Sequence, residues 1–569
     1  MPEILIGEYL FLRLKEIGVE TVFGVPGDFE LALLDLVEPQ GLSWIGTPNE
    51  LVGGYAADGY ARVKGAAAVV TTFGPGELSA LCALGGAFTE FVPVLHIVGY
   101  PSTQAQKSGK ILHHTLGDGS YEHYVKMSSE LSCATAVLKD SSTAVAEIDR
   151  VLNAMMYHSQ PGYIGISEDV AYTKVSTEYL KTPIVRTLPP SASEPEAKAL
   201  AKVMELLESA KSPILIIDGG AARQSWAEHI DPLIESLKIP FFVSVIGKGI
   251  ANEESMYYKG CYNGAASCPD HVVEAVEKAD CILWLGNYPS DFNTGIFSEK
   301  IDPNTVIDLQ RFFMKIGETK YDAKINHILP KLTKAFQSRS KQSQLIVSQS
   351  PALHVPRPEK IEHEWLWDRM STFFQPGDLV ISETGTCQAG LTASKFPAGC
   401  GGWTQAVYGS IGYAAGAAAG GAIAAQETGK FKRMVLITGE GSLQLTIQAF
   451  SILNRFGIPA VVFILNNGGY TIERFFRGWN AAYNDIPIWD YSAIFKALSP
   501  DVPEAKGFKV TTAAELDALL SDHEFNSATY PQCVDMIMDE HDAPKVLTAT
   551  FEATKASAEA ALQNGVDGN

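Results

Sequence analysis

Met434-Val-Leu-Ile-Thr-Gly-Glu-Gly-Ser442 is the stretch that decides the fold. Its first residues are apolar on both faces and run into a glycine-rich turn, as in a parallel strand covered by helices. A helix is expected next, on the spacing of Leu443, Leu445, Ile447 and Phe450. A second apolar run, 460–465, ends in Asn466-Asn-Gly-Gly-Tyr470. The pattern predicts consecutive strand, turn, helix and strand of an open α/β sheet.

Apolar runs of the same kind recur along the whole chain. They are residues 68–72, 93–98, 213–218, 239–244, 281–285, 305–308 and 378–381. Helical patterns separate them, so the predicted fold class is α/β, with three doubly wound parallel-sheet domains.

Two polar, proline-rich segments, 181–195 and 337–358, are predicted to be linkers. They divide the chain into predicted domains at 1–182, 196–336 and 359–569.

Composition limits the possible partners. The 569 residues contain 44 Lys and Arg against 65 Asp and Glu, which gives a net charge of −21. This balance disfavours nucleic acids and anionic membranes, both of which attract basic surfaces, and favours a small-molecule ligand. The Gly/Ala-rich stretch 409–425 fits a closely packed core helix better than a membrane span.

The expected location is the cytoplasm. The eight cysteines include no C-x-x-C pair, so we predict reduced core thiols rather than a zinc site or a redox pair. The first residues lack a basic region followed by an apolar core, and the last lack a retention or peroxisomal signal.

The turn at Gly439-Glu-Gly-Ser442 is a candidate phosphate site, because backbone N–H groups at a strand-to-helix turn bind phosphate. Alone it is a weak signal, since ordinary turns share this composition. Asn466-Asn467 follows Gly441 after 24 intervening residues and strengthens it. Glu440, an Asn oxygen and a backbone carbonyl would form an oxygen cage suited to Mg²⁺ on a diphosphate.

This pairing resembles the thiamine-diphosphate motif, in which Gly-Asp-Gly is followed at a similar distance by Asn-Asn. The resemblance extends to the pyruvate decarboxylase and 2-oxo-acid decarboxylase family, in its fungal form. The motifs that carry it are Val25-Pro-Gly-Asp-Phe29, Asn49-Glu-Leu51, Ala56-Ala-Asp-Gly-Tyr-Ala-Arg62, His113-His-Thr-Leu-Gly-Asp118, Ser382-Glu-Thr-Gly-Thr386, Tyr408-Gly-Ser-Ile-Gly412, Gly441-Ser-Leu-Gln-Leu-Thr446 and Gly469-Tyr-Thr-Ile-Glu473.

The resemblance implies a carboxy-lyase that converts a 2-oxo acid, pyruvate first, to an aldehyde and CO₂ with thiamine diphosphate and Mg²⁺. It also implies a pyrimidine-binding domain at 1–182, a middle domain at 196–336 and a diphosphate-binding domain at 359–569. The family places the cofactor between the first domain of one chain and the third domain of another. A homodimer with shared sites, and a homotetramer built from it, are therefore expected.

Five catalytic residues follow from the resemblance. Glu50 would share a proton with the pyrimidine nitrogen N1′ of the cofactor, a task that suits a carboxylate in an apolar site. Asp28 and His114 would relay protons and His113 would orient them, because groups that titrate near neutrality serve this best. Glu473 would act on the substrate carboxylate and the enamine.

The cofactor and metal ligands also follow from the resemblance. Expected cofactor contacts are Thr386, Gly409, Ile411, Gly441, Ser442 and Ile472. Expected metal ligands are Glu440, Asn467 and Gly469.

Departures from the family pattern leave alternatives open. Glu440 stands where the family has Asp; we expect cofactor binding to persist, with a non-catalytic family member as the alternative. Phe476 stands where pyruvate-preferring and branched-chain members carry a smaller aliphatic residue, so aromatic or branched-chain 2-oxo acids such as phenylpyruvate and indolepyruvate are the second choice. Gln388 replaces an aromatic residue of some broad-specificity members.

Two further points concern regulation and rival chemistry. Ala221 and Ala222 occupy the region of a yeast-type regulatory cysteine, which puts that route of substrate activation in doubt. Carboligation of the acetolactate synthase kind is disfavoured by His113-His114 and by the lack of a flavin motif.

Overall fold

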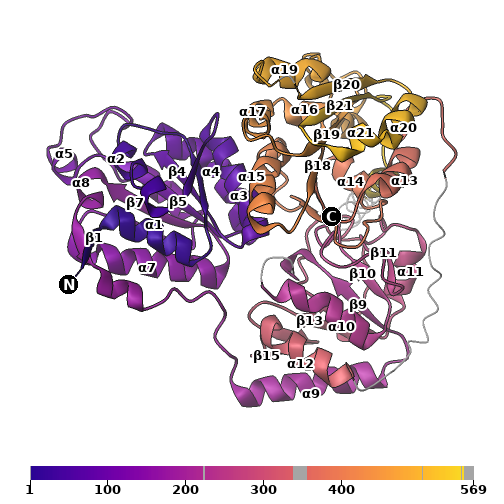
Figure 1. The fold of residues 1–569 in the computed structure, drawn as a ribbon. Helices are drawn as coiled ribbons and strands as arrows, with labels where there is room; N and C mark the ends of the chain where they lie inside the picture. The colour runs from indigo at the N-terminus through magenta and orange to yellow at the C-terminus, as the bar shows by residue number, and fades with distance from the viewer. Residues whose placement is uncertain (1, 222–224, 338–354, 503, 553, 556–569) are drawn as a thin grey trace, which may run out of the picture. The chain divides into compact units, whose positions relative to one another are not determined.

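The chain divides into two compact units, shown as a ribbon in Figure 1. The computed structural model describes residues 2–221, 225–337, 355–502, 504–552 and 554–555. The first unit comprises residues 1–188, 412–430 and 446–458. The second comprises 189–411, 431–445 and 459–569. Their three large sheets are mostly parallel and flanked by helices, which confirms the predicted α/β class.

The sheet of the first unit has the order β3-β2-β4-β5-β7-β6 and is parallel throughout. Its strands are β2 (Thr21–Gly24), β3 (Ser43–Gly46), β4 (Ala67–Thr72), β5 (Val94–Tyr100), β6 (Ala134–Leu138) and β7 (Gly162–Ser167). β1 (Glu3–Leu5) and β8 (Lys174–Ser176) form a separate antiparallel pair. The α-helices are α1 (Ile6–Glu16), α2 (Leu31–Leu34), α3 (Glu50–Lys64), α4 (Pro75–Thr89), α5 (Thr103–Lys107), α6 (His123–Ser129), α7 (Ser141–His158), α8 (Glu168–Ala171), α15 (Tyr413–Thr428) and α17 (Phe450–Arg455).

The second unit contains two sheets, of which the first has the order β11-β10-β9-β12-β13-β14-β15. Its strands are β9 (Pro213–Ile217), β10 (Phe241–Val243), β11 (Tyr258–Cys261), β12 (Cys281–Leu285), β13 (Val306–Leu309), β14 (Met314–Ile316) and β15 (Thr319–Tyr321). Among these described strands, β14 pairs antiparallel with both β13 and β15, and the other neighbouring strands pair parallel. The associated helices are α9 (Ser193–Ser209), α10 (Ile230–Leu237), α11 (His271–Glu277) and α12 (Ile325–Gln337).

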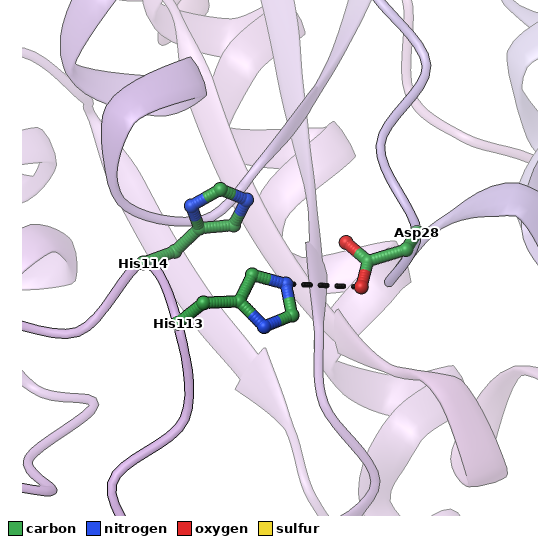
Figure 2. A group of neighbouring side chains, drawn as sticks. All are labelled: Asp28, His113 and His114. Carbon is green, nitrogen blue, oxygen red and sulfur yellow. Dashed lines mark ion pairs between the residues drawn. The ribbon is translucent and has the colours of Figure 1, made fainter.

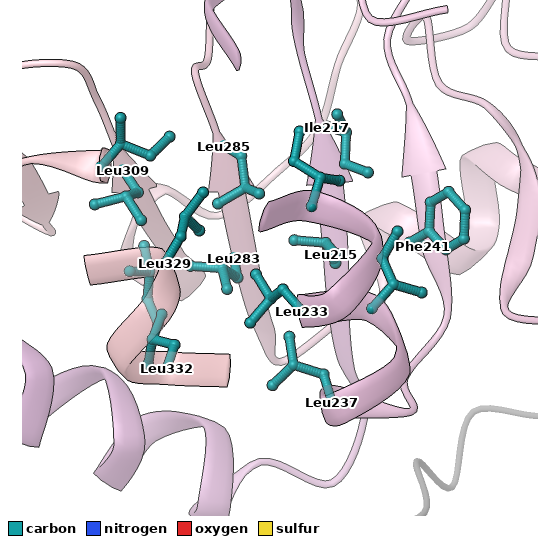
Figure 3. Close-up of a cluster of buried hydrophobic side chains, with 14 of the residues drawn as sticks. Leu215, Ile217, Leu233, Leu237, Phe241, Leu283, Leu285, Leu309, Leu329 and Leu332 are labelled. Carbon is teal, nitrogen blue, oxygen red and sulfur yellow. The ribbon is translucent and has the colours of Figure 1, made fainter. Parts of the chain in front are cut away.

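One face of this sheet shows why its strands are apolar. In Figure 3, leucines of β9 and β12 meet Leu233 and Leu237 of α10 and Leu329 of α12. All of these side chains are buried. Because helices cover the strands, apolar residues do not alternate with polar ones along them. Each strand therefore appears in the sequence as a continuous apolar run.

The other sheet of the second unit is parallel throughout, in the order β17-β16-β18-β19-β21-β20. Its strands are β16 (Asp378–Ser382), β17 (Gly401–Thr404), β18 (Arg433–Gly439), β19 (Ala460–Asn466), β20 (Lys506–Val510) and β21 (Gln532–Ile537). The helices are α13 (His363–Phe373), α14 (Thr386–Leu391), α16 (Glu440–Leu443), α18 (Thr471–Arg477), α19 (Ile494–Leu498), α20 (Ala513–Ser521) and α21 (His523–Ser527). Every strand predicted above is present in these three sheets.

The Gly/Ala-rich stretch forms a core helix, as predicted. α15 packs against α3 so closely that a Cβ on Gly420 would lie 1.8 Å from the carbonyl oxygen of Ala56. A Cβ on Gly59 would lie 2.0 Å from the carbonyl oxygen of Ala417. Glycine is therefore needed at both positions for the backbones to approach. Among the described residues, no helix combines the length and apolarity needed to span a membrane.

Two predictions are wrong in part. The helix expected from 443 to 450 is broken, because α16 ends at Leu443 and α17 begins at Phe450. Between them Thr446 has non-helical backbone angles and donates its hydroxyl to the Gly412 carbonyl at 2.6 Å, while Leu445 is 45% exposed. All eight cysteines are free thiols as expected, but Cys82 is exposed rather than in a core.

The domain boundaries stay predictions. Each sheet falls within one predicted domain, yet α15 and α17 come from the third predicted domain and cluster with the first unit. Ala222 and most of the predicted linker 337–358 lie outside the described residues.

A buried ion pair leads to a prediction about the stability of the last sheet. Asp378 binds the Arg433 guanidinium through contacts of 2.9 and 2.7 Å, and both side chains are almost fully buried. Asp378→Ala would leave the Arg433 charge buried without its partner, which costs about 3–5 kcal/mol. We expect the urea unfolding midpoint of this variant to fall markedly. The exposed pair of Lys506 and Glu524 supplies the control, since Glu524→Ala should change stability by less than about 0.5 kcal/mol.

Candidate active site

Three predicted catalytic side chains of the first unit come together in the structure (Figure 2). Asp28 lies on the loop after β2, and His113 and His114 lie on the segment between α5 and α6. The Nε2 atom of His113 is 3.0 Å from Oδ2 of Asp28. One ring nitrogen of each histidine and one carboxylate oxygen of Asp28 lie within 4.8 Å of one another. The loops that carry them meet at the carboxyl edge of the sheet, where ligands of such sheets bind.

Aromatic packing and backbone contacts fix the two histidines. The ring of Phe29 stacks on that of His113, with centroids 4.8 Å apart. The carbonyl of His114 accepts a hydrogen bond from the Tyr124 hydroxyl at 2.8 Å. A Cβ on Gly74 would lie 2.4 Å from that carbonyl oxygen, so the segment needs glycine there. Burial, then the neighbouring His113, lower the pKa of His114, and Asp28 partly offsets this. His114 is therefore biased toward the neutral form that accepts a proton.

Glu50 is the first residue of α3 and is half-buried. The helix start is fixed by Asn49, whose side-chain oxygen accepts the N–H of Val52 at 2.8 Å. A Cβ on Gly76 would lie 3.2 Å from Oε1 of Glu50, which places this carboxylate beside the start of α4. Within the described residues the structure gives Glu50 no hydrogen bond to the Asp28–His113–His114 group.

Sequence reasoning missed two buried carboxyl groups in this unit. Glu77 accepts hydrogen bonds from the N–H of Gly74 at 3.1 Å and from the Tyr163 hydroxyl at 2.9 Å. Burial raises its pKa to about 7. Glu30, two residues after Asp28, is 1% exposed, and burial raises its pKa to about 8. A Glu in a polar motif or a first helical turn normally lies in water, so no sequence signal marked either residue.

The candidate diphosphate and metal end lies in the second unit. β18 ends at Gly439, and Glu440 begins the short helix α16, as the motif predicts. Glu440 is 3% exposed, and its Oε1 accepts the N–H of Gly469 at 2.8 Å. Burial raises the pKa of Glu440 to about 7, while backbone N–H groups of the 467–469 turn act in the opposite direction.

The donor set at this turn fits a hard cation. The Asn467 side-chain amide lies 3.2 Å from Oε1 of Glu440 and 2.9 Å from the carbonyl oxygen of Gly469. One orientation of the amide donates its nitrogen to both oxygens, and the other presents its oxygen beside them, where a cation would bind all three. A carboxylate, an amide oxygen and a backbone carbonyl are ligands that Mg²⁺ accepts. The longer side chain of Glu440 still reaches this group.

Of the predicted cofactor contacts, Ile472 lies beside Gly385, the residue that precedes Thr386. Thr386 begins α14, and Cδ1 of Ile472 lies 3.4 Å from where a Cβ on Gly385 would be. The ring of Tyr470 packs over Gly441, whose Cβ would lie 2.8 Å from it. The remaining predicted contacts are Ser442, which is buried, and Gly409 and Ile411, which are half-buried.

Glu473 lies on α18 and is exposed, without an ion pair to any described side chain. Its neighbour Arg474 is buried and was missed by sequence reasoning. Arg474 donates to the Gly468 carbonyl at 2.9 Å and pairs with Glu540 at 2.9 Å. It therefore ties the helix that carries Glu473 to the turn that carries Asn467.

An aromatic cluster lies beside this helix. The ring centroids of Phe476 and Phe551 are 5.1 Å apart at an edge-to-face angle, and Phe475 and Trp479 are also 5.1 Å apart. Phe476 remains 42% exposed, so it is available to contact a ligand. Gln388, by contrast, is buried in α14.

Three parts of the chain match models of known protein families. Residues 5–130 match the thiamine pyrophosphate enzyme N-terminal TPP binding domain, residues 200–330 the central domain, and residues 383–535 the C-terminal TPP binding domain. The fold and the site thus define a thiamine pyrophosphate enzyme.

Individual relatives narrow the class. The chain is 40% identical over 562 residues to pyruvate decarboxylase isozyme 3 of Saccharomyces cerevisiae, covering 98% of this chain and 99% of the relative. It is 40% identical over 555 residues to a pyruvate decarboxylase of Aspergillus terreus, covering 96% of each. A pyruvate decarboxylase of Candida glabrata is 39% identical over 567 residues, covering 98% of this chain and 99% of the relative. The chain belongs to the pyruvate decarboxylase-like family of thiamine pyrophosphate enzymes.

Proposed function

We propose that the chain catalyses the non-oxidative decarboxylation of a 2-oxo acid, pyruvate first, to an aldehyde and CO₂. The observation that carries this proposal is the Asp28–His113–His114 group at the carboxyl edge of a sheet, in a chain that matches fungal pyruvate decarboxylases over nearly its full length.

The cofactors proposed are thiamine diphosphate and Mg²⁺. When bound, thiamine diphosphate supplies the nucleophile and the electron sink that decarboxylation requires. Glu440, Asn467 and the Gly469 carbonyl would hold the metal, and Gly441, Ser442 and Thr386 would meet the diphosphate. Gly409, Ile411 and Ile472 would orient the rest of the cofactor.

The protein's own groups would hold and move protons. Glu50 would exchange a proton with N1′ of the pyrimidine. Asp28 and His114 would supply and accept protons at the substrate oxygen and carbon, with His113 held between Asp28 and the ring of Phe29. Glu473, free of an ion pair among the described residues, would face the substrate carboxylate and favour its loss as neutral CO₂.

The catalytic residues fall in two units, Glu50 and the Asp28 group in the first and the metal residues in the second. We propose that one chain's first unit and a second chain's second unit complete each site, which makes a homodimer the smallest active form and a homotetramer the expected assembly. We also propose a cytoplasmic location, which the eight free thiols support because disulfides are rare in reducing compartments.

An aromatic 2-oxo acid is the second candidate substrate. The exposed face of Phe476, backed by Phe551, offers a ring for stacking. A non-catalytic role is less favoured, because Glu440 keeps its carboxylate among oxygen donors.

The direct test is decarboxylation of pyruvate, phenylpyruvate and indolepyruvate with thiamine diphosphate and Mg²⁺ present, following aldehyde with a coupled dehydrogenase. Turnover with pyruvate ranked first is expected. Absence of aldehyde from all three substrates, with the cofactor demonstrably bound, would refute the proposal.

Phe476→Ile tests which side chains the pocket prefers. Exchanging a ring for a smaller aliphatic group should change the ratio of kcat/KM for pyruvate to that for phenylpyruvate by about 10–200-fold in favour of pyruvate. Phe292→Ile is the matched control, since Phe292 has the same 42% exposure in the segment between β12 and β13. An unchanged ratio in the Phe476 variant would remove this residue from the pocket.

A further inference from the structure

Glu30 is buried two residues after Asp28, between the turn that carries Asp28 and the ends of β4 and β5. A Cβ on Gly27 would lie 2.7 Å from Oε1 of Glu30, and a Cβ on Gly99 would lie 2.6 Å from Oε2. Two glycines therefore make the space that this carboxyl group fills. Neither carboxyl oxygen has a well-formed hydrogen bond, and the Thr72 hydroxyl beside them also lacks one.

The chain connects Glu30 rigidly to the catalytic group. Asp28 pairs with His113, Phe29 stacks on His113, and Glu30 follows at once. The N–H of Glu30 donates to the carbonyl of Gly27 at 3.3 Å, and its own carbonyl accepts the N–H of Leu34. A shift of the Glu30 side chain would therefore move the turn that presents Asp28.

A charge on Glu30 would have no cation to balance it in this enclosure. Three groups face the Glu30 carboxyl group. They are the Asp28 carboxylate on the 27–30 loop, the Thr72 hydroxyl at the end of β4, and Gly99 at the end of β5. None of these three carries a positive charge, and Asp28 opposes a second negative charge. The neutral acid can instead donate its proton to the Thr72 hydroxyl.

We propose that Glu30 is a positioning residue that holds the Asp28–His113–His114 group in its working geometry only while the Glu30 carboxyl group is protonated. Ionisation at alkaline pH drives the carboxylate toward water, shifts the turn and separates Asp28 from His113. This inference rests on the proposed decarboxylase function, and it predicts that the decarboxylase activity falls at alkaline pH.

Glu30→Gln is the decisive variant, because Gln has the shape of the neutral acid, keeps a donor and does not ionise. Burial raises the pKa of Glu30 to about 8, so the wild-type kcat/KM for pyruvate should fall above that pH. At pH 9 the variant should exceed the wild type about tenfold, and below pH 7 the two should agree within about threefold. Glu77→Gln, another buried carboxyl with a raised pKa, should keep the alkaline fall.

A second measurement needs no turnover. His113 is exposed, so its carbethoxylation rate can be followed by peptide mass spectrometry across the pH range. The wild type should show an extra step near pH 8 that Glu30→Gln lacks.

The outcomes separate the two proposals. Decarboxylation with the same alkaline fall in wild type and Glu30→Gln overturns the role of Glu30 and leaves the proposed function intact. No decarboxylation by the wild type refutes the proposed function. The pH step in His113 carbethoxylation then decides the role of Glu30. A step present only in the wild type supports that role, and no step in the wild type overturns it.

Discussion

Glu50→Gln should lower kcat for pyruvate by about 10²–10⁴-fold while thiamine diphosphate still binds. Glu50 begins α3 beside the start of α4, where its carboxylate is half-buried. The amide has the same shape but exchanges no proton with the cofactor's pyrimidine nitrogen. Binding through the diphosphate and metal is untouched, because those residues belong to the second unit. Steady-state kinetics and a thermal shift with cofactor and Mg²⁺ measure the two effects separately.

The matched control is Glu194→Gln, which changes an acid that is 77% exposed on α9 and should leave both quantities unchanged. A Glu50 variant that keeps kcat within about tenfold of the wild type would show that another group activates the cofactor. A variant that loses cofactor binding as well would show a structural role for Glu50.

Glu440→Ala should abolish Mg²⁺-dependent stabilisation by thiamine diphosphate. The alanine removes the only carboxylate of the proposed donor set and leaves the Asn467 and Gly469 oxygens, so Mg²⁺ affinity should fall more than about 100-fold. In the wild type, ligand at 100 times its Kd adds about 2.7 kcal/mol to stability. That gain should vanish from the thermal unfolding of the variant, together with its activity.

Glu440→Asp tests the extra methylene separately, since Asp is the family's residue. It keeps the carboxylate and should retain cofactor-dependent stabilisation. Glu504→Ala, at an exposed acid of the same unit, is the neutral control. If Glu440→Ala kept the full gain in stability, the metal would have to lie elsewhere.

Much of the candidate site could be predicted from motifs. The pairing of Asp28 with His113 and the approach of Glu440 to Asn467 and Gly469 both follow expected motif partners. Arg474 and Glu30 were missed, because their importance lies in burial and contacts rather than in residue type or spacing. The predicted helix from 443 to 450 failed because Thr446 satisfies a distant carbonyl, at Gly412, instead of continuing the helix.

The sequence by itself determined the strands, the α/β class and the family, because continuous apolar runs and glycine-rich turns are local signals that follow directly from burial between helices and from backbone geometry. Tertiary structure alone decided which loops meet. Strand order brings Asp28 to His113 across the sheet, and tertiary packing encloses Glu30 between Gly27 and Gly99 and places α15 on α3. These contacts depend on the relative positions of distant segments, and hence on the free energy of the whole packed unit rather than on any one stretch of chain.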